Sequence, residues 1–318
     1  MVSVVVVAPG QGSQSPGFLE PWLTEPRFAE HLEALADAAE VDLRTHGTVS
    51  DADTIRDTAV AQPLIVAASL LTLGAVLGDD PGESGTRLAK LAGVAGHSVG
   101  ELAAAAAAGI LSESDAMVLV RERGRAMAAA AAQVATGMSA VIGADEAELL
   151  AKLAELGLEP ANFNGGGQLV AAGELPALEA LREAPPAGAR VIQLQVAGAF
   201  HTRFMAPAVE TLRGVAAGLD VSDPNITIWT NSDGSTVASG ARFVELLVGQ
   251  VASPVRWDLT MEAFAAAGIT GLIELAPAGA LVGLAKRGLK GVPTVAVKTP
   301  DDLAAARELI DTAGASAA

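Results

Sequence analysis

The sequence predicts an α/β fold, with a mainly parallel sheet into which a smaller unit is inserted. Short apolar segments with strand character alternate with helical patterns in both end portions of the chain. The middle portion changes to the order strand-helix-strand-strand-helix-strand. Apolar residues make up 51% of the 318 residues, which is enough for a sizeable buried core and excludes a disordered chain.

The first elements alternate in the manner of a buried parallel sheet. The β-branched run Val2–Ala8 predicts a strand that ends in the loop Pro9–Gly12. Helical patterns follow at Pro26–Ala39 and Leu64–Leu77, and Pro63 suits the first turn of the second helix.

A second strand–helix unit follows. Ala89–Ala95 predicts a buried strand, and the segment Gly96-His97-Ser98-Val99-Gly100 connects it to an alanine-rich helix. A further helix is predicted from about Ser114 to Ala132. This alternation is typical of an α/β layer.

The middle portion has the pattern of a ferredoxin-like unit. Its expected elements, in chain order, are Ser139–Gly143, Asp145–Leu156, Asn162–Asn164, Gln168–Ala172, Leu175–Ala184 and Arg190–Val196. Gly165-Gly166-Gly167 is interpreted as a hairpin turn, because it lacks the strand–loop–helix context and the following lysine of a phosphate-binding loop.

The main unit resumes with a helix after His201 and strands at Ile226–Thr230 and Gly271–Leu275. We therefore expect a discontinuous main domain of residues 1–130 and 199–318, with a ferredoxin-like subdomain of residues 131–198. The small-residue tail Gly314–Ala318 is predicted to fray.

Composition excludes several classes of protein. The chain has no cysteine, which rules out disulfides, thiolate metal sites and a cysteine nucleophile. Its net charge of -17 argues against nucleic acid as a partner. Apolar runs such as Leu102–Leu111 and Ala126–Ala132 are too short to cross a bilayer, and the valine-rich start lacks the basic region of a signal peptide. We expect a cytoplasmic globular protein that binds neither metal nor membrane.

The segment Gly96–Gly100 has the form Gly-x-Ser-x-Gly between a predicted strand and a predicted helix. Such a sharp turn exposes the serine hydroxyl at a helix N-terminus, where free amides stabilise an oxyanion. Ser98 is therefore a candidate nucleophile. The alternative interpretation is an ordinary Gly-Ser turn that caps a helix.

Among the four histidines, His201 is the best candidate for the base that activates Ser98. His31 lies in an acidic helix, and His46 lies in a polar connection without a motif. His97 directly precedes the serine, so its side chain is expected to point away from the hydroxyl and pack beneath the turn. The acids between Ser98 and His201 fall mostly on helices that look exposed, so a backbone carbonyl or amide could orient the histidine instead of a carboxylate.

An ordered set of motifs carries a resemblance to a known family. The motifs are Pro9-Gly10-Gln11-Gly12-Ser13-Gln14, Gly96-His97-Ser98-Val99-Gly100-Glu101, Arg123-Gly124, Asn162-Phe163-Asn164, Ala199-Phe200-His201, Pro254-Val255-Arg256-Trp257 and Lys286-Arg287. Together they resemble the malonyl-CoA:acyl carrier protein transacylases of fatty acid and polyketide synthesis, from Val5 to about Lys298. The resemblance implies an α/β-hydrolase-like core with an inserted ferredoxin-like subdomain.

The resemblance also implies a role for each matching residue. Ser98 would carry the malonyl group as an ester, and His201 would move its proton. Gln11 and Val99 would donate backbone N–H groups to the oxyanion. Arg123 would hold the malonyl carboxylate, since a planar guanidinium suits a bidentate grip. The alternatives are a solvated helix face for Arg123 and a turn-forming role for Gln11.

The remaining positions concern the cleft. The resemblance makes the main-chain carbonyl of Gln250 the group that orients the histidine, and it makes Asn162 a polar residue of the cleft. Met127, four residues after Arg123, would line the acyl pocket. Phe200 would occupy the space of an α-methyl group and favour malonyl over methylmalonyl, or would simply pack in the core.

The implied partners are malonyl-CoA and an acyl carrier protein, with no cofactor beyond the coenzyme A of the substrate. Because carrier proteins are acidic, we expect a local basic patch at the cleft mouth. The candidates are Lys286, Arg287 and Lys290, followed by Arg203 and Arg190. We expect a monomer. The competing functions are a serine hydrolase or thioesterase, and a catalytically silent scaffold that binds carrier protein.

Overall fold

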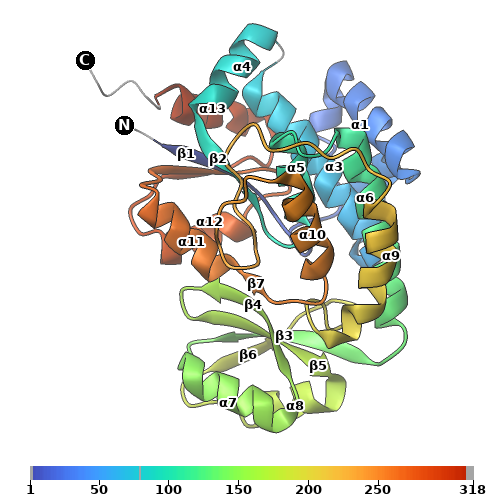
Figure 1. Ribbon diagram of the computed structural model, residues 1–318, viewed down its shortest axis with the longest axis vertical. Helices are drawn as coiled ribbons and strands as arrows, with labels where there is room; N and C mark the ends of the chain where they lie inside the picture. The colour runs from blue at the N-terminus through green and yellow to red at the C-terminus, as the bar shows by residue number, and fades with distance from the viewer. Residues whose placement is uncertain (1–2, 79, 313–318) are drawn as a thin grey trace.

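The computed structural model describes residues 3–78 and 80–312, and it arranges them around two sheets (Figure 1). The larger unit contains four parallel strands in the order β2-β1-β8-β9. Their bounds are β1 Val4–Ala8, β2 Leu91–Gly96, β8 Gly271–Glu274 and β9 Thr294–Ala296. The tail Gly314–Ala318 lies outside the described residues.

The valines of β1 explain why helices cover both faces of this sheet. Val4 and Val6 belong to one apolar cluster, which includes apolar residues of helix α3 (Thr58–Leu77), whereas Val5 and Val7 belong to another, which includes Trp257 of helix α11 (Trp257–Ala266). Successive side chains of a strand point to opposite faces, so a strand that is buried on both faces needs an unbroken apolar run. The helices are α1 Pro26–Ala39, α2 Leu43–Thr48, α3 Thr58–Leu77, α4 Pro81–Lys90, α5 Gly100–Ala107, α6 Glu113–Ala131, α9 Ala206–Ala216, α10 Gly240–Gln250, α11 Trp257–Ala266, α12 Ala280–Gly288 and α13 Leu303–Asp311.

Helix α3 is the central core helix of the larger unit. Its 20 residues are long and apolar enough to cross a membrane by length and composition, whereas the predicted helix Leu64–Leu77 was too short to do so. In the structure, 89% of its apolar window is buried within the protein. A helix that is apolar on all sides is buried in a core or in a bilayer, and here neighbouring helices cover it.

Two predicted elements differ from the structure by more than a shift of a few residues at one end. Helix α3 begins at Thr58 because the Asp57 side chain accepts a hydrogen bond from the Ala59 amide, so Pro63 lies inside the helix and not in its first turn. The segment 226–230 does not form a strand. Its main-chain hydrogen bonds to β2 all go to Val94, so it forms a single bridge there and no ladder. A second bridge joins Trp229 to Thr236.

The second sheet has the strand order β6-β3-β5-β4-β7 (Figure 1, bottom). Its strands are β3 Thr136–Ile142, β4 Glu159–Gly165, β5 Gln168–Glu174, β6 Arg190–Gln193 and β7 Val255–Arg256. Helices α7 Glu146–Leu156 and α8 Leu175–Glu183 pack beside it. Strands β3 to β6 with these two helices form the predicted ferredoxin-like arrangement, and Gly165–Gly167 forms the predicted hairpin turn.

The fifth strand of this sheet comes from the other end of the chain. Strand β7 pairs in parallel with β4, where Asn162 is opposite Val255 and Phe163 is opposite Arg256. This pairing links the inserted segment to the C-terminal part of the larger unit through main-chain hydrogen bonds. Strand β7 lies outside the predicted subdomain of residues 131–198.

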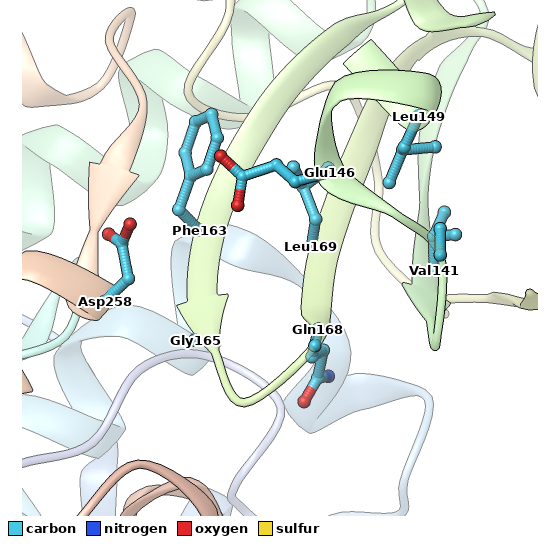
Figure 2. A pocket seen from close by; sticks show the side chains of 10 residues that line it. Val141, Glu146, Leu149, Phe163, Gly165, Gln168, Leu169 and Asp258 are labelled. Atoms are coloured by element: carbon cyan, nitrogen blue, oxygen red, sulfur yellow. The ribbon is translucent and has the colours of Figure 1, made fainter.

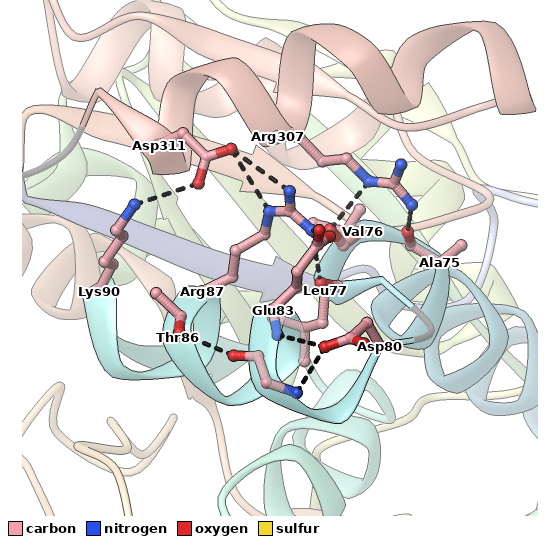
Figure 3. A network of polar contacts seen from close by, with 11 residues as sticks. Ala75, Val76, Leu77, Asp80, Glu83, Thr86, Arg87, Lys90, Arg307 and Asp311 are labelled. Carbon is pink, nitrogen blue, oxygen red and sulfur yellow. Dashed lines mark hydrogen bonds and ion pairs between the residues drawn. The ribbon is translucent and has the colours of Figure 1, made fainter.

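Two arginines attach the C-terminal helix α13 to the end of α3 (Figure 3). Arg307 donates to the carbonyls of Ala75 and Val76, at 2.6 and 3.3 Å. Arg87 donates to the carbonyl of Leu77 at 2.9 Å and pairs with Asp311. Cations stabilise the last carbonyls of a helix, so these contacts hold α13 on the larger unit.

Candidate active site

Ser98 lies on a sharp turn between β2 and α5. Its φ is 53°, in the left-handed region that residues with a side chain rarely adopt. The flanking glycines make the turn possible. A Cβ atom at Gly96 would lie 2.0 Å from the Gly100 carbonyl carbon, and one at Gly100 would lie 2.2 Å from the Ala8 oxygen. The turn therefore presents the hydroxyl at the N-terminus of α5, as in a nucleophile elbow.

His201 meets Ser98 on one side and a backbone carbonyl on the other. The distance from Ser98 Oγ to His201 Nε2 is 2.7 Å, and Nδ1 lies 2.8 Å from the main-chain oxygen of Gln250. Because a carbonyl only accepts, Nδ1 carries the proton and Nε2 is free to accept from the hydroxyl. Burial lowers the pKa of His201 to about 3, helped by the positive charge of Arg123, so the imidazole is neutral.

Two backbone amides near Ser98 are free to bind an oxyanion. Among the described residues, neither the Gln11 amide nor the Val99 amide donates to a protein acceptor. Val99 is the N-cap of α5. The loop that carries Gln11 lies against the elbow, as shown by the 3.0 Å that would separate a Cβ atom at Gly10 from the His97 carbonyl oxygen. The Gln11 side chain contacts the Arg56 carbonyl at 3.4 Å.

Arg123 is buried beside the serine and not on a solvated helix face. Only 1% of it is exposed. Its Nη1 donates to Gln62 Oε1 at 2.7 Å, and its Nη2 donates to Gln250 Oε1 at 2.8 Å and lies 3.4 Å from Ser98 Oγ. Its Nε has no partner among the described residues. Burial lowers the pKa of Arg123 to about 10, so it stays protonated at neutral pH.

Gly124 explains how this arginine reaches the interior. A Cβ atom there would lie 2.9 Å from the Thr58 carbonyl, so only glycine lets α6 approach α3 this closely. The neighbouring Arg121 and Arg125 instead form ion pairs with Glu40 and Glu122.

The three remaining predicted cleft residues are all buried. Met127 follows Arg123 on the same helix face, and its sulfur lies 3.4 Å from Gln62 Nε2. Phe200 and Met127 both belong to the main apolar cluster. Asn162 lies in β4, and no side-chain hydrogen bond joins it to another described residue.

The other histidines lie outside the Ser98–His201 pair. His97 packs edge-on against Trp257 with ring centroids 5.6 Å apart, and its Nε2 lies 3.0 Å from Asn164 Oδ1. His31 pairs with Glu113 at 2.7 Å, and His46 contacts Ser50.

Sequence reasoning missed a residue that holds the elbow from behind. Asn231 accepts from the Ser98 amide at 2.7 Å and donates to the Gly96 carbonyl at 2.6 Å. It therefore joins both ends of the turn. An asparagine directly after the apolar segment 226–230 was the only signal in the sequence.

The acids between Ser98 and His201 were expected to lie mostly on exposed helices, and Glu101 is an exception. It is 1% exposed. It accepts from the Asn231 amide at 2.6 Å and from the Gln250 side chain. Burial raises the pKa of Glu101 to about 7, against the opposing effects of these hydrogen bonds and of Arg123. The available signal was its position, as the only charged residue between Ser98 and Ser112.

Two cavities lie near the junction of the two units. One of about 430 Å³ is lined by Glu101, Gln250, Phe163 and Arg256, among others, so it reaches the residues behind the elbow. The other, of about 50 Å³, lies against the second sheet, where its lining includes Phe163, Leu169, Glu146 and Asp258 (Figure 2). None of the predicted site residues lines this second cavity. Within residues 3–78 and 80–312, no group of three or more His, Asp or Glu is placed to hold a metal ion.

Comparison with known proteins gives one consistent family. The acyl transferase domain model matches residues 5–306. The chain is 50% identical to the malonyl CoA-acyl carrier protein transacylase of Mycobacterium tuberculosis over 94% of this chain and 98% of that protein. It is 34% identical to the Escherichia coli enzyme of the same name, over 97% and 100%.

Solved structures agree with this result. The crystal structure of the Mycobacterium tuberculosis transacylase has a TM-score of 0.91, 49% identity, and coverage of 96% of this chain and 99% of that one. A malonyl-transacylase in complex with its type II polyketide carrier protein has a TM-score of 0.87 and 30% identity, over 96% and 99%. This chain belongs to the acyl transferase domain family, and within that family to the malonyl CoA-acyl carrier protein transacylases.

Proposed function

We propose that this enzyme moves a malonyl group from malonyl-CoA, through an ester on Ser98, to the thiol of an acyl carrier protein. The acceptor would serve fatty acid or polyketide synthesis. One observation carries the choice of acyl group: the buried guanidinium of Arg123 lies 3.4 Å from the nucleophilic oxygen. A charge buried this deeply needs a partner, and a malonyl carboxylate supplies one.

The acylation step follows from the contacts around Ser98. His201 Nε2 takes the hydroxyl proton while Oγ attacks the thioester carbonyl, and the amides of Gln11 and Val99 stabilise the oxyanion. The C–S bond then breaks, and the imidazolium returns its proton to the leaving thiolate of coenzyme A. The Gln250 carbonyl stabilises the charged imidazole through Nδ1. Transfer to the carrier protein reverses these steps, with its thiol as the nucleophile.

Acyl selection rests on Arg123 with two apolar neighbours. The unpartnered Nε leaves the guanidinium a donor for the malonyl carboxylate. Met127 and Phe200 would shape the space around the malonyl methylene, and Asn162 would provide a polar group in the cleft. Arginine binds a carboxylate with a planar pair of donors, which an acetyl group does not use.

Intact-protein mass spectrometry tests the proposal against the competing functions. After brief incubation with malonyl-CoA, we expect one malonyl increment that is absent in Ser98→Ala and is discharged by added acyl carrier protein. Free coenzyme A without a protein increment would support a hydrolase or thioesterase. If the protein gained no mass increment and released no coenzyme A, only the function of a catalytically silent scaffold would remain.

We further propose that the carrier protein contacts Lys286, Arg287 and Lys290. All three are exposed, and Arg287 also donates to Gln168 Oε1 at 2.7 Å. Arg203 is the weaker candidate because it pairs with Glu159, and Arg190 lies on the edge strand β6. A local basic patch would offset the repulsion expected from the net charge of -17.

Charge reversal at Lys286 and Arg287 should slow transfer to carrier protein and leave malonyl loading of Ser98 unchanged. An equal loss in both half-reactions would refute the patch. We expect the enzyme to act in the cytoplasm as a monomer.

A further inference from the structure

We infer that Glu101 is a positioning residue for acyl selection, which acts through the Gln250 side chain to hold Arg123 for the malonyl carboxylate. The inference rests on the proposed function. It assigns to the buried acid of α5 a role separate from the proton transfer between Ser98 and His201.

Three side chains form a polar chain behind the serine. Arg123 Nη2 donates to Gln250 Oε1 at 2.8 Å, and Gln250 Nε2 donates to Glu101 Oε2. The same Nε2 also lies 3.1 Å from the Ser98 carbonyl and 3.2 Å from Asn231 Oδ1. The amide oxygen therefore faces a group that can only donate, and the amide nitrogen faces groups that accept. This arrangement gives Gln250 a single orientation.

The chemistry of the site calls for a carboxylate at position 101. Both of its oxygens accept N–H donors, one from the Asn231 amide at 2.6 Å and one from Gln250. An amide of the same size would place an NH₂ group against a donor at one of these two contacts. The buried position makes such an unsatisfied contact costly.

The intervening amide keeps the charges of Glu101 and Arg123 apart. Among the described residues, Arg123 donates to neutral oxygens: the amide oxygens of Gln62 and Gln250, and the more distant Ser98 hydroxyl. A carboxylate in direct contact would form a closed ion pair and compete with the substrate carboxylate. Above the Glu101 pKa of about 7, the carboxylate one amide further away gives the buried cation a nearby counter-charge, and the cation still lacks a directly bonded anion.

Gln250 serves the two parts of the site through different atoms. Its main-chain carbonyl faces His201, whereas its side chain joins Glu101 to Arg123. A change of the side chain alone therefore leaves the histidine contact in place. This separation allows acyl selection to be tested apart from proton transfer.

The test is a double-mutant cycle with Glu101→Gln, Gln250→Met and the double variant. The measurement is the single-turnover rate of loading Ser98 from malonyl-CoA and from acetyl-CoA. We expect the ratio of malonyl to acetyl rates to fall by roughly tenfold or more in each single variant, the size of one hydrogen bond to a charged group. Because Glu101 acts through Gln250, the double variant should lose no more of this ratio than Gln250→Met alone.

Several results would overturn the inference. An equal loss for both acyl groups in Glu101→Gln would mean that Glu101 only supports the elbow through Asn231. If the losses of the malonyl-to-acetyl ratio in the two single variants added up in the double variant, Glu101 would not act through Gln250. If Glu101→Gln did not fold, Gln250→Met would decide alone, because an unchanged ratio there rejects the chain of contacts.

A matched control and the wild type separate this inference from the proposed function. Glu245→Gln changes an exposed glutamate of α10 and should leave the ratio unchanged. Failure of the wild-type protein to load malonyl at all would refute the proposed function. Normal malonyl loading with an unaltered ratio in the variants would refute only the role of Glu101.

Discussion

The interiors of the two units of this protein contain different kinds of side chain. Behind Ser98, the interior of the larger unit contains charged and polar side chains, including Glu101, Arg123, Asn231 and Gln250. The apolar core of the second sheet is aliphatic, with residues such as Val141, Leu149, Leu153, Leu169, Leu178 and Leu181.

Charged side chains of the second unit stay at its surface. Lys152 pairs with Glu155 at 3.1 Å, and Arg182 pairs with Glu179, in both cases three residues apart on a helix. Apolar packing alone is enough to stabilise a wall of a cleft. A reacting centre needs hydrogen-bond donors and acceptors with fixed directions. Leaving such a buried group unpaired costs free energy of folding. Substitutions should therefore alter chemistry in the first region and stability in the second.

The largest effect is expected at the base. His201→Ala removes the acceptor that lies 2.7 Å from Ser98 Oγ, so malonyl loading should fall by about 10³-fold or more. Stopped reactions analysed by intact-protein mass spectrometry measure the rate. His46→Ala is the control, because that ring contacts Ser50 and lies outside the site. A variant of His201 that loaded at the wild-type rate would place the base elsewhere.

Arg123→Ala should affect the acyl groups unequally. Loss of the guanidinium should lower malonyl loading by roughly 10²–10³-fold, while acetyl loading survives or improves. Parallel assays with malonyl-CoA and acetyl-CoA measure the difference. Arg125→Ala, an exposed arginine on the same helix, should change neither rate. Equal losses for both acyl groups would move Arg123 out of acyl binding.

Leu153→Ala tests the second region. The side chain is 1% exposed in the aliphatic core, so its truncation should cost about 2–5 kcal/mol in the free energy of unfolding. Malonyl loading at a temperature where the variant stays folded should remain close to wild type. Urea denaturation gives the stability, and the half-buried Leu150→Ala should cost less. A loading defect without a loss of stability would contradict the proposed division between the regions.

Acid titration provides the smallest effect and involves two buried groups with opposite shifts. The pKa of His201 falls from 6.5 to about 3, so between these values only the unfolded state is protonated, and stability rises with pH. The pKa of Glu101 rises from 4.5 to about 7, so its contribution is fully present below pH 4.5 and is lost as the pH rises through 7. The two slopes oppose each other between pH 4.5 and 6.5.

Glu101→Gln removes one of these slopes. Between pH 5 and 6, the stability of this variant should rise relative to wild type by about 1.4 kcal/mol per pH unit. Denaturant unfolding of both proteins at several pH values measures the difference, and every group that they share cancels. A difference that does not change with pH would show that Glu101 titrates normally.

The sequence was most informative about elements and motifs with local signals. The ferredoxin-like order was visible because each strand and helix has its own periodicity, from Thr136 to Gln193. The residues proposed for catalysis stand in short segments with recognisable neighbours, such as Ser98 between two glycines. The start of α3 was missed because Pro63 looked like a first-turn residue, whereas the capping side chain of Asp57 lies further upstream.

Residue types, their local periodicity and their covalent neighbours determined the α/β class, the order of strands and helices along the insertion and the candidate nucleophile, because these depend on short stretches of chain. Only the tertiary structure decided that Glu101 is buried, that Asn231 joins the ends of the elbow, and that β7 extends the second sheet. Asn231 is 133 residues from Ser98, and no local pattern specifies a contact at that separation. Such contacts form only when the packed elements bring donors to acceptors in a place that water does not reach.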